Sequence, residues 1–473
     1  MPDACRGARL LVMSSLAHAD VQPLLAEVAG RAWRYLASLD ERPVAPDDAA
    51  LAGLARFDEP LPEVAGDAAA TVALLDEAGS PATMASAGGR YFGFVIGGSY
   101  PVALAASWLA TAWDQNAGLP VMSPVAARLH EVVTGWLGEL FGLPAGSAAV
   151  FVTGAAMANA AALTAARDQQ LARAGWDVQA DGLFGAPELT VVIGEKAHST
   201  LIKALGLIGL GRDRVRQVRA DDQGRMRADC LPQDVTGPAV ICVQAGEVNT
   251  GAFDPFPAVV EWARPRRAWI HVDGAFGLWA LADPSRRDLT AGLTDADSWA
   301  TDAHKWLNVP YDCGIALVRR PEDLRRSFAS VAGYLPPDTG FEAMQHTPQA
   351  SQRARQVEVW AVLRTLGRHG ITDLIVRTCA HAQAMATRLR EAGLEVLNDV
   401  VLNQVLVRAT TDDQTVALVK AVQQDGTCWC GPTVWAGRPA MRISVSGWAT
   451  SGEDINQSAD AIIAAAQRIG PPA

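Results

Sequence analysis

Several short stretches of this 473-residue sequence carry residues that could do chemistry, and each follows an apolar run that predicts a buried strand. The first is Gly154-Ala155-Ala156-Met157, where a predicted strand leads directly into a helical pattern. Small side chains let an anion approach the free N–H groups at the start of a helix, where the helix dipole favours negative charge. No Gly-Lys-Ser/Thr follows, so this is not a Walker loop. The run predicts a phosphate site, and a tight turn chosen for packing is the alternative.

Two further residues, His198 and Asp273, follow predicted strands. A flat imidazole at the edge of a sheet can stack on an aromatic cofactor or move a proton, whereas the alternative makes Ser199 a helix cap and His198 an ordinary surface residue. Burying the carboxylate of Asp273 would cost free energy unless a partner offset that cost. A protonated pyridine nitrogen is one such partner, and a helix cap is the alternative.

The last candidate is Lys305, which lies between a predicted strand and an apolar segment. A desolvated lysine amine is a poorer cation and a better imine former, although a surface lysine would fit the same position. Together the small-residue turn, His198, Asp273 and Lys305 supply an anion site, a ring face, a partner for a ring nitrogen and an amine for an aldehyde. These are the needs of pyridoxal 5′-phosphate, which we therefore expect as the cofactor.

The elements that must position these residues alternate between strands and helices. This alternation predicts an α/β fold with a mostly parallel central sheet covered by helices, in which ligands bind beyond the carboxyl ends of the strands. Ser123 and Pro124 are the N-cap and first residue expected of a further helix, which Gly142 and Pro144 end. The predicted strands are residues 148–152, 189–193, 239–243, 268–272, 297–301 and 314–318, with helices at 154–174 and 199–210.

The sequence divides into a helical N-terminal arm at 1–90, a large cofactor-binding domain at 91–350 and a smaller α+β domain at 351–473. In the arm, residues 17–39 predict a helix, and the proline-containing stretch 42–62 suits a segment that wraps over a neighbour. In the last domain we expect helices at 350–368 and 372–392, and strands at 404–407 and 440–445.

Over roughly residues 85–473 the sequence resembles the group II pyridoxal-phosphate-dependent amino-acid decarboxylases, which have the aspartate aminotransferase fold, fold type I. The order of His-Val-Asp-x-Ala and His-Lys-Trp is the most specific part of this resemblance. The matching motifs are residues 123–144, the turn at 153–159, His198, Gly251-Ala252-Phe253-Asp254-Pro255, residues 271–277 and Asp302-Ala303-His304-Lys305-Trp306.

The resemblance implies a role for each matching residue. Lys305 would hold the cofactor aldehyde, Asp273 would pair with the ring nitrogen, and His198 and Ala275 would pack on the two ring faces. It also implies a homodimer with shared active sites and an exchanged N-terminal arm. The phosphate would be held by Gly154, Ala155, Ala156, Met157, Asp302 and His304.

The resemblance implies decarboxylation of an L-amino acid to an amine and CO₂. Tyr91, Phe92 and Phe94 precede a segment that lines the substrate side in the family, and such aromatic walls would favour an aromatic or apolar side chain. Packing of the same residues in the core is the alternative. The alternatives are oxidative formation of an aldehyde and carbon–carbon cleavage on the same fold. A cofactor-free interaction protein is a third possibility, and the intact Lys305 and Asp273 argue against it.

The sequence departs from the family pattern at several positions. Many members carry a tyrosine on a loop after the lysine that protonates Cα, and residues 340–355 hold none. Phe341 and His346 are the nearest candidates there, with Tyr334 just upstream, and His346 is our candidate proton donor. Glu247 stands where threonine or asparagine is more usual, and it faces either the substrate or a neighbouring helix.

Composition limits the binding partners and the cellular location that we expect. The 40 Lys and Arg against 51 Asp and Glu give a formal net charge of −11, which repels phosphate backbones and anionic lipid, so we expect neither a nucleic-acid nor a membrane partner. The apolar run at 102–113 is shorter than the roughly 20 residues that cross a bilayer. The first residues lack a signal-peptide pattern, so we expect a cytoplasmic protein with reduced cysteines and no metal site.

Overall fold

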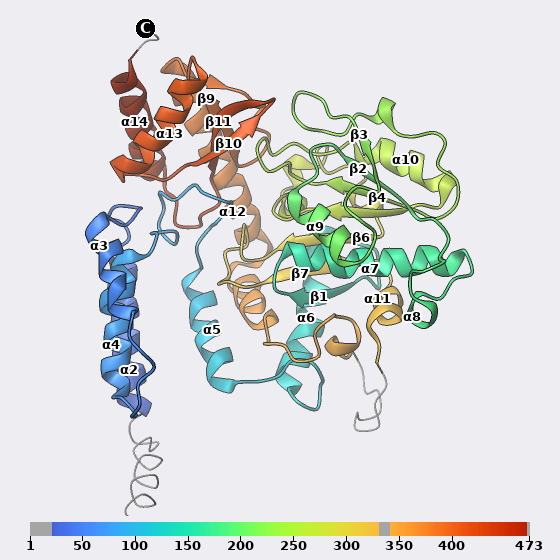
Figure 1. The fold of residues 1–473 in the computed structure, drawn as a ribbon, viewed down its shortest axis with the longest axis horizontal. Coiled ribbons are helices and arrows are strands. Elements are labelled where there is room, and N and C mark those ends of the chain that lie inside the picture. The colour runs from blue at the N-terminus through green and yellow to red at the C-terminus, as the bar shows by residue number, and fades with distance from the viewer. Residues whose placement is uncertain (1–20, 331–340, 471–473) are drawn as a thin grey trace, which may run out of the picture.

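The computed structural model describes residues 21–330 and 341–470, and a seven-stranded sheet in the order β1-β7-β6-β5-β4-β2-β3 forms its centre (Figure 1). β7 pairs antiparallel with both β1 and β6, and the other pairs are parallel. The predicted fold class is therefore confirmed. The strands are β1 (Ala148–Val152), β2 (Thr190–Gly194), β3 (Val215–Val218), β4 (Ala239–Gln244), β5 (Trp269–Asp273), β6 (Ser298–Asp302) and β7 (Gly314–Val318).

Helices cover both faces of this sheet. One face packs on α7 (Ala155–Arg173), α9 (Ser199–Leu207) and α11 (Pro321–Phe328). The other packs on α6 (Pro124–Phe141), α10 (Phe256–Arg266) and the first part of α12 (Gln356–Glu391).

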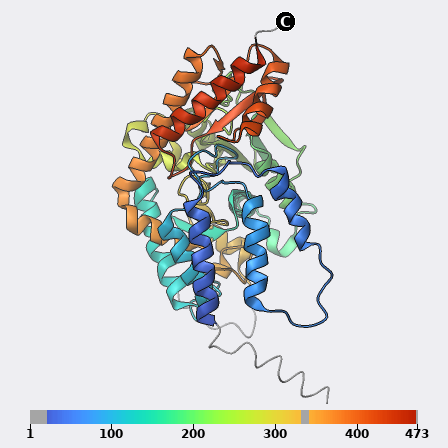
Figure 2. The same cartoon turned by 90° about the vertical axis from the view of Figure 1, so that its left-hand side faces the viewer.

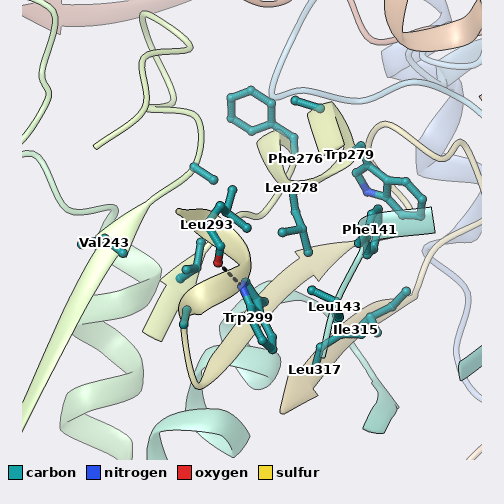
Figure 3. Packing of buried hydrophobic residues seen from close by; sticks show 14 of the residues in the cluster. Phe141, Leu143, Val243, Phe276, Leu278, Trp279, Leu293, Trp299, Ile315 and Leu317 are labelled. Atoms are coloured by element: carbon teal, nitrogen blue, oxygen red, sulfur yellow. Dashed lines mark hydrogen bonds between the residues drawn. The ribbon is translucent and has the colours of Figure 1, made fainter. Parts of the chain in front are cut away.

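Large aromatic side chains fill the core on the second face, where Phe141, Trp279 and Trp299 lie among the aliphatic side chains of β7 (Figure 3). Trp299 is fully buried, and its indole N–H donates to the carbonyl of Leu293 at 2.8 Å. The polar atom of this large side chain is therefore satisfied inside an otherwise apolar core.

A smaller antiparallel sheet in the order β10-β11-β9-β8 lies beside the large one. Its core is shared with α13, α14 and the second part of α12, so α12 runs from one core to the other (Figure 1). The bounds are β8 (Glu395–Val396), β9 (Gln404–Arg408), β10 (Gly431–Trp435), β11 (Arg438–Ser444), α13 (Asp412–Asp425) and α14 (Gly452–Ile469).

The N-terminal helices α2 (Val21–Ala37), α3 (Asp48–Gly53) and α4 (Ala68–Gly79) lie on the outside of the molecule (Figure 2). In α2 and α3 no described side chain is buried, and in α4 only Ala78 is. The remaining helices are α5 (Pro101–Trp113), α8 (Val178–Asp181) and 3₁₀ helices at Leu54–Phe57, Ser80–Ala82, Ala228–Cys230, Gly277–Ala282, Pro284–Arg286, Leu293–Asp295 and Ala343–Gln345.

Most predicted elements form within a residue or two of their expected bounds. The Ser123 hydroxyl accepts from the Ala126 N–H, and Gly142 ends α6 in the left-handed region, as expected. The two helices expected at 350–368 and 372–392 are both present within α12, because the backbone leaves the helical region at Gly367 (φ 60°, ψ −176°) and a kink there divides the element in two. The first of the two begins at Gln356. No helix in the described ranges is both long enough and apolar enough to cross a membrane.

Candidate active site

The predicted site residues gather at one edge of the large sheet. β2, β5 and β6 run parallel within this sheet, so their carboxyl ends meet there. His198 follows β2, whereas Asp273 and Asp302 are the last residues of β5 and β6. Lys305 follows three residues after β6, and its charge and that of His198 act on the ionisation of Asp273. The structure therefore brings these four residues together.

Asp273 is a buried carboxylate with one oxygen satisfied and one free. Its Oδ2 accepts a hydrogen bond from Asn159 Nδ2 at 3.1 Å, whereas its Oδ1 is buried with no partner among the described residues. Burial raises the pKa of Asp273, and the nearby His198 and Lys305 act in the opposite direction. An unpaired buried acceptor of this kind is costly, and the protonated nitrogen of a pyridine ring would satisfy it. The residues therefore fit pyridoxal phosphate.

Asp302 links Lys305 to the start of α7. Its Oδ2 lies 3.0 Å from Lys305 Nζ, and its Oδ1 accepts from the Ala155 N–H at 2.6 Å. One N–H group at the helix start, where we expect the phosphate, is thus already hydrogen-bonded to the Asp302 carboxylate. Of the other N–H groups in the first turn, those of Met157 and Ala158 donate to the Gly154 carbonyl at 2.9 Å, which leaves the Ala156 N–H for an anion.

Close backbone contact shapes the turn before α7. A Cβ on Gly314 would lie 2.4 Å from the Cα of Gly154, so β7 can lie against this turn only with glycine there. Ala155 is buried, whereas Gly154, Ala156 and Met157 are half-buried. The turn is therefore narrow and lined by small groups, as a phosphate cradle requires.

The two histidines of the site have defined ring protons. His198 is the N-cap of α9, and its Nδ1 accepts from the Thr200 N–H at 3.3 Å, so its Nε2 carries the proton. His304 Nδ1 likewise accepts from the Cys313 N–H at 3.0 Å, and its Nε2 lies 3.5 Å from Asp302. Burial lowers the pKa of both imidazoles, which favours neutral rings.

Ala275 is the half-buried residue after Gly274, and its carbonyl accepts from the Asp302 N–H at 2.9 Å. This bond ties the loop after β5 to the end of β6. The small Ala275 side chain therefore stays near Asp273 and Asp302, where a ring face can contact it.

His346 belongs to a different cluster of rings. It is buried, its Nδ1 lies 2.8 Å from the Glu342 carbonyl, and its ring stacks on Phe341 at 4.2 Å. Phe341 stacks in turn on His130. These contacts do not test the proton-donor role, which stays a prediction, and Tyr334 lies outside the described residues.

Glu247 turns toward its own loop. Its buried carboxylate accepts from the N–H groups of Asn249 at 2.7 Å and Thr250 at 2.8 Å. Burial raises the pKa of Glu247, and these bonds oppose that effect. The carboxylate therefore holds the turn at residues 247–250, and these bonds do not decide between the two possibilities left open.

Sequence reasoning assigned no role to Asn159, His271 or Asn308, and the structure connects all three to the site. Asn159 bonds both Asp273 and His271. Asn308 donates to the carbonyls of Lys305 at 2.9 Å and Ser446 at 3.0 Å, so it fixes the lysine loop. The available signal was a polar residue inside an apolar helix or segment, which predicts a specific hydrogen-bond partner.

The comparisons with known proteins agree with this arrangement. The family model described as the pyridoxal-dependent decarboxylase conserved domain matches residues 85–409. L-2,4-diaminobutyrate decarboxylase of Rhizobium meliloti (strain 1021) is 30% identical over 87% of this chain and 85% of that protein. Aromatic-L-amino-acid decarboxylase of Bacillus atrophaeus is 27% identical over 59% of this chain and 58% of that protein.

Among solved structures, that of Oryza sativa TDC with PLP and tryptamine has a TM-score of 0.89 at 23% identity. The match covers 96% of this chain and 99% of that chain. At this identity the likeness establishes a common architecture that includes both sheets and the N-terminal helices.

Proposed function

Because this chain belongs to the pyridoxal-dependent decarboxylase family and is a pyridoxal phosphate-dependent carboxy-lyase, we propose that it decarboxylates an aromatic or apolar L-amino acid to the amine and CO₂. The observation that carries the proposal is the free buried oxygen of Asp273 beside Lys305. Bound pyridoxal phosphate supplies an aldehyde for the substrate amine and a protonated ring that accepts the electron pair left by CO₂.

Each residue of the site has a separate proposed role toward the cofactor. Lys305 Nζ, which lies 3.0 Å from Asp302, would bind the aldehyde, and Asp273 would keep a proton on the ring nitrogen through Oδ1. His198 and Ala275 would pack on the two ring faces. The turn formed by Gly154, Ala155, Ala156 and Met157 at the start of α7 would hold the phosphate, with His304 Nε2 as a further donor, while the Ala155 N–H donates to Asp302.

His346 is the proposed donor of the proton that Cα takes up after CO₂ leaves. The support for this role is its position in the segment after the lysine and the absence of tyrosine from residues 341–355. The ring stack with Phe341 holds the imidazole in one orientation.

Aromatic side chains near the site support the proposed substrate class. Trp429 stacks on Tyr91 at 5.2 Å and on Phe94 at 5.5 Å. Tyr91 and Asp302 both act on the ionisation of Tyr311, whose ring lies 4.4 Å from that of His304. These ring contacts support an aromatic wall on the substrate side, which would favour an aromatic or apolar side chain. Phe92 does not belong to this wall because it is fully buried in the core of the small sheet.

The N-terminal helices support a homodimer whose subunits share their active sites. Large apolar side chains of this arm stay exposed, including Trp33 at 69% and Leu75 at 63%. Helix α5 likewise exposes Trp108 and Leu109, at 45% and 56%. An apolar surface of this extent marks an interaction site, and a second copy of the chain would cover it.

The test is to incubate the holoenzyme with separate amino acids and identify every product by mass. The set includes tryptophan, tyrosine, phenylalanine, leucine and 2,4-diaminobutyrate. The proposal predicts an amine and CO₂ from an aromatic or apolar member. Aldehyde with ammonia and peroxide, a carbon–carbon cleavage product, or turnover of 2,4-diaminobutyrate alone would contradict it.

A further inference from the structure

A chain of hydrogen bonds between buried side chains ends on Asp273. Trp269 Nε1 lies 2.8 Å from Ser298 Oγ, and Ser298 Oγ lies 2.8 Å from His271 Nδ1. His271 Nε2 lies 2.9 Å from Asn159 Oδ1, and Asn159 Nδ2 lies 3.1 Å from Asp273 Oδ2. Each of these residues is at most 5% exposed, so the groups bond to one another rather than to bulk water.

The sheet geometry assembles this chain. Trp269, His271 and Asp273 alternate along β5 and therefore point to the same face. The pairing of β5 with β6 sets Ser298 opposite His271. Helix α7 covers that face and places Asn159 between His271 and Asp273.

The donors and acceptors that each side chain offers allow only one direction of donation along this chain of hydrogen bonds, from Trp269 to Asp273. The indole of Trp269 can only donate, so the Ser298 hydroxyl accepts from it and donates its own hydrogen to His271 Nδ1. His271 then carries its proton on Nε2 and donates to Asn159 Oδ1, which leaves the Asn159 amide to donate to Asp273. Burial lowers the pKa of His271 to about 3, which is consistent with a neutral ring.

Donation in the opposite direction, from Asp273 toward Ser298, would leave a buried donor unsatisfied. It would need a proton on Asp273, and Ser298 would accept from both Trp269 and His271. The Ser298 hydrogen would then have no acceptor among the described residues. Because an unsatisfied buried donor is costly, the chain stabilises the ionised carboxylate against the burial that opposes it.

We propose that Asn159, His271, Ser298 and Trp269 are positioning residues that keep Asp273 ionised and occupy its Oδ2, so that Oδ1 is left for the cofactor ring nitrogen. This inference rests on the proposed function, in which Asp273 holds that nitrogen. It adds that residues without contact to the cofactor control the ring's protonation through a fixed sequence of donors and acceptors.

The first test measures the direction of the chain in the holoenzyme. The ring nitrogens of His271 are observed by ¹⁵N NMR with labelled histidine, and a His271→Gln sample identifies its signals. The proposal predicts a proton on Nε2 and none on Nδ1 between about pH 6 and 8. A proton on Nδ1, or on both nitrogens, would overturn it.

The second test measures what the chain does to the cofactor, with pyridoxal phosphate labelled with ¹⁵N at the ring nitrogen. In Asn159→Ala and Ser298→Ala the ring-nitrogen signal should move toward its unprotonated value, and the cofactor Kd of Asn159→Ala should rise by about tenfold or more. Ser298→Thr keeps the hydroxyl and should restore the signal. The matched control is Asn398→Ala, because Asn398 is also buried and donates to two carbonyls, of Thr250 and Gln404, away from the site.

The Asp273→Ala variant separates the two proposals. If Asp273→Ala moves the ring-nitrogen signal and Asn159→Ala does not, the positioning role is wrong and the proposed function stands. If Asp273→Ala also leaves the signal unmoved, the placement of the ring on Asp273 is itself wrong. A shift of equal size in Asn398→Ala would also contradict the positioning role, because general loss of stability would then explain it.

Discussion

Lys305 offers the most direct prediction for a single residue. Its side chain is one-fifth exposed, its amine is ion-paired with Asp302, and no other group is proposed to bind the cofactor aldehyde. Lys305→Ala should abolish both turnover and the visible absorption of the cofactor–lysine bond, measured on purified protein with added pyridoxal phosphate. Lys203→Ala, which removes an exposed lysine of α9, is the control. A Lys305→Ala protein that absorbs like the unaltered enzyme would refute the assignment.

Asp273 should control rate more than cofactor content. Asparagine keeps the shape of the side chain but loses the charge that holds a proton on the ring nitrogen. Asp273→Asn should therefore retain cofactor while kcat falls by about two to three orders of magnitude. Asp254→Asn, which neutralises a buried carboxylate bound to backbone N–H groups of Met226 and Gln244, controls for lost stability. Unchanged turnover would exclude the role.

Asp302 places a negative charge beside the proposed phosphate site. Asp302→Asn keeps an oxygen for the Ala155 N–H but removes the charge, so the phosphate should be repelled less. We expect the cofactor Kd to fall by roughly fivefold in a titration of the apoenzyme. The control is Asp297→Asn, just before the opposite end of β6, where the carboxylate accepts from the Ile270 N–H. Weaker or equal binding would show that Asp302 contributes something other than repulsion.

His346 carries the prediction about the fate of the substrate carbon. Phenylalanine can replace its ring in the stack on Phe341 but cannot donate a proton. His346→Phe should raise the ratio of aldehyde to amine among the products, as measured by mass spectrometry. His130→Phe alters the same stack without removing His346 and serves as the control. An unaltered ratio in His346→Phe would show that His346 is not the proton donor.

At the scale of elements, local pattern was sufficient for most of the large sheet. Apolar runs predicted β1, β4, β5 and β7 because fully buried strands need apolar residues on both faces. β3 was missed because it is an edge strand whose central residues, Arg216 and Gln217, are exposed and carry no apolar signal.

Sequence alone could predict only those site residues whose type and position by themselves imply a binding partner. A strand-end carboxylate or a lysine before an apolar segment signals a partner, so Asp273 and Lys305 could be found. The role of Asn159 depends on which strand pairs with β5 and which helix lies above it, and that is information from distant parts of the chain. Local sequence does not contain it.

At the scale of the whole molecule, the exposed arm predicts a subunit interface. Trp33→Glu puts a charge into the apolar surface of α2 without removing a buried contact. We expect this variant to sediment as a lighter species and to lose activity in parallel, because active sites shared as we propose would need both subunits. Phe184→Glu is the matched control, since Phe184 is 99% exposed and lies in the large domain. A fully active Trp33→Glu monomer would contradict shared active sites.

The side chain of Asn308 has a mechanical consequence. It donates to the backbone beside Lys305 and to Ser446, accepts from the Trp448 N–H at 2.6 Å, and its own carbonyl accepts from Tyr100. A rotation of the C-terminal unit would therefore pull on the peptide that carries the reactive amine. Capture of vitamin B6 at Lys305 therefore depends on how the C-terminal unit is seated, because one amide side chain joins the two.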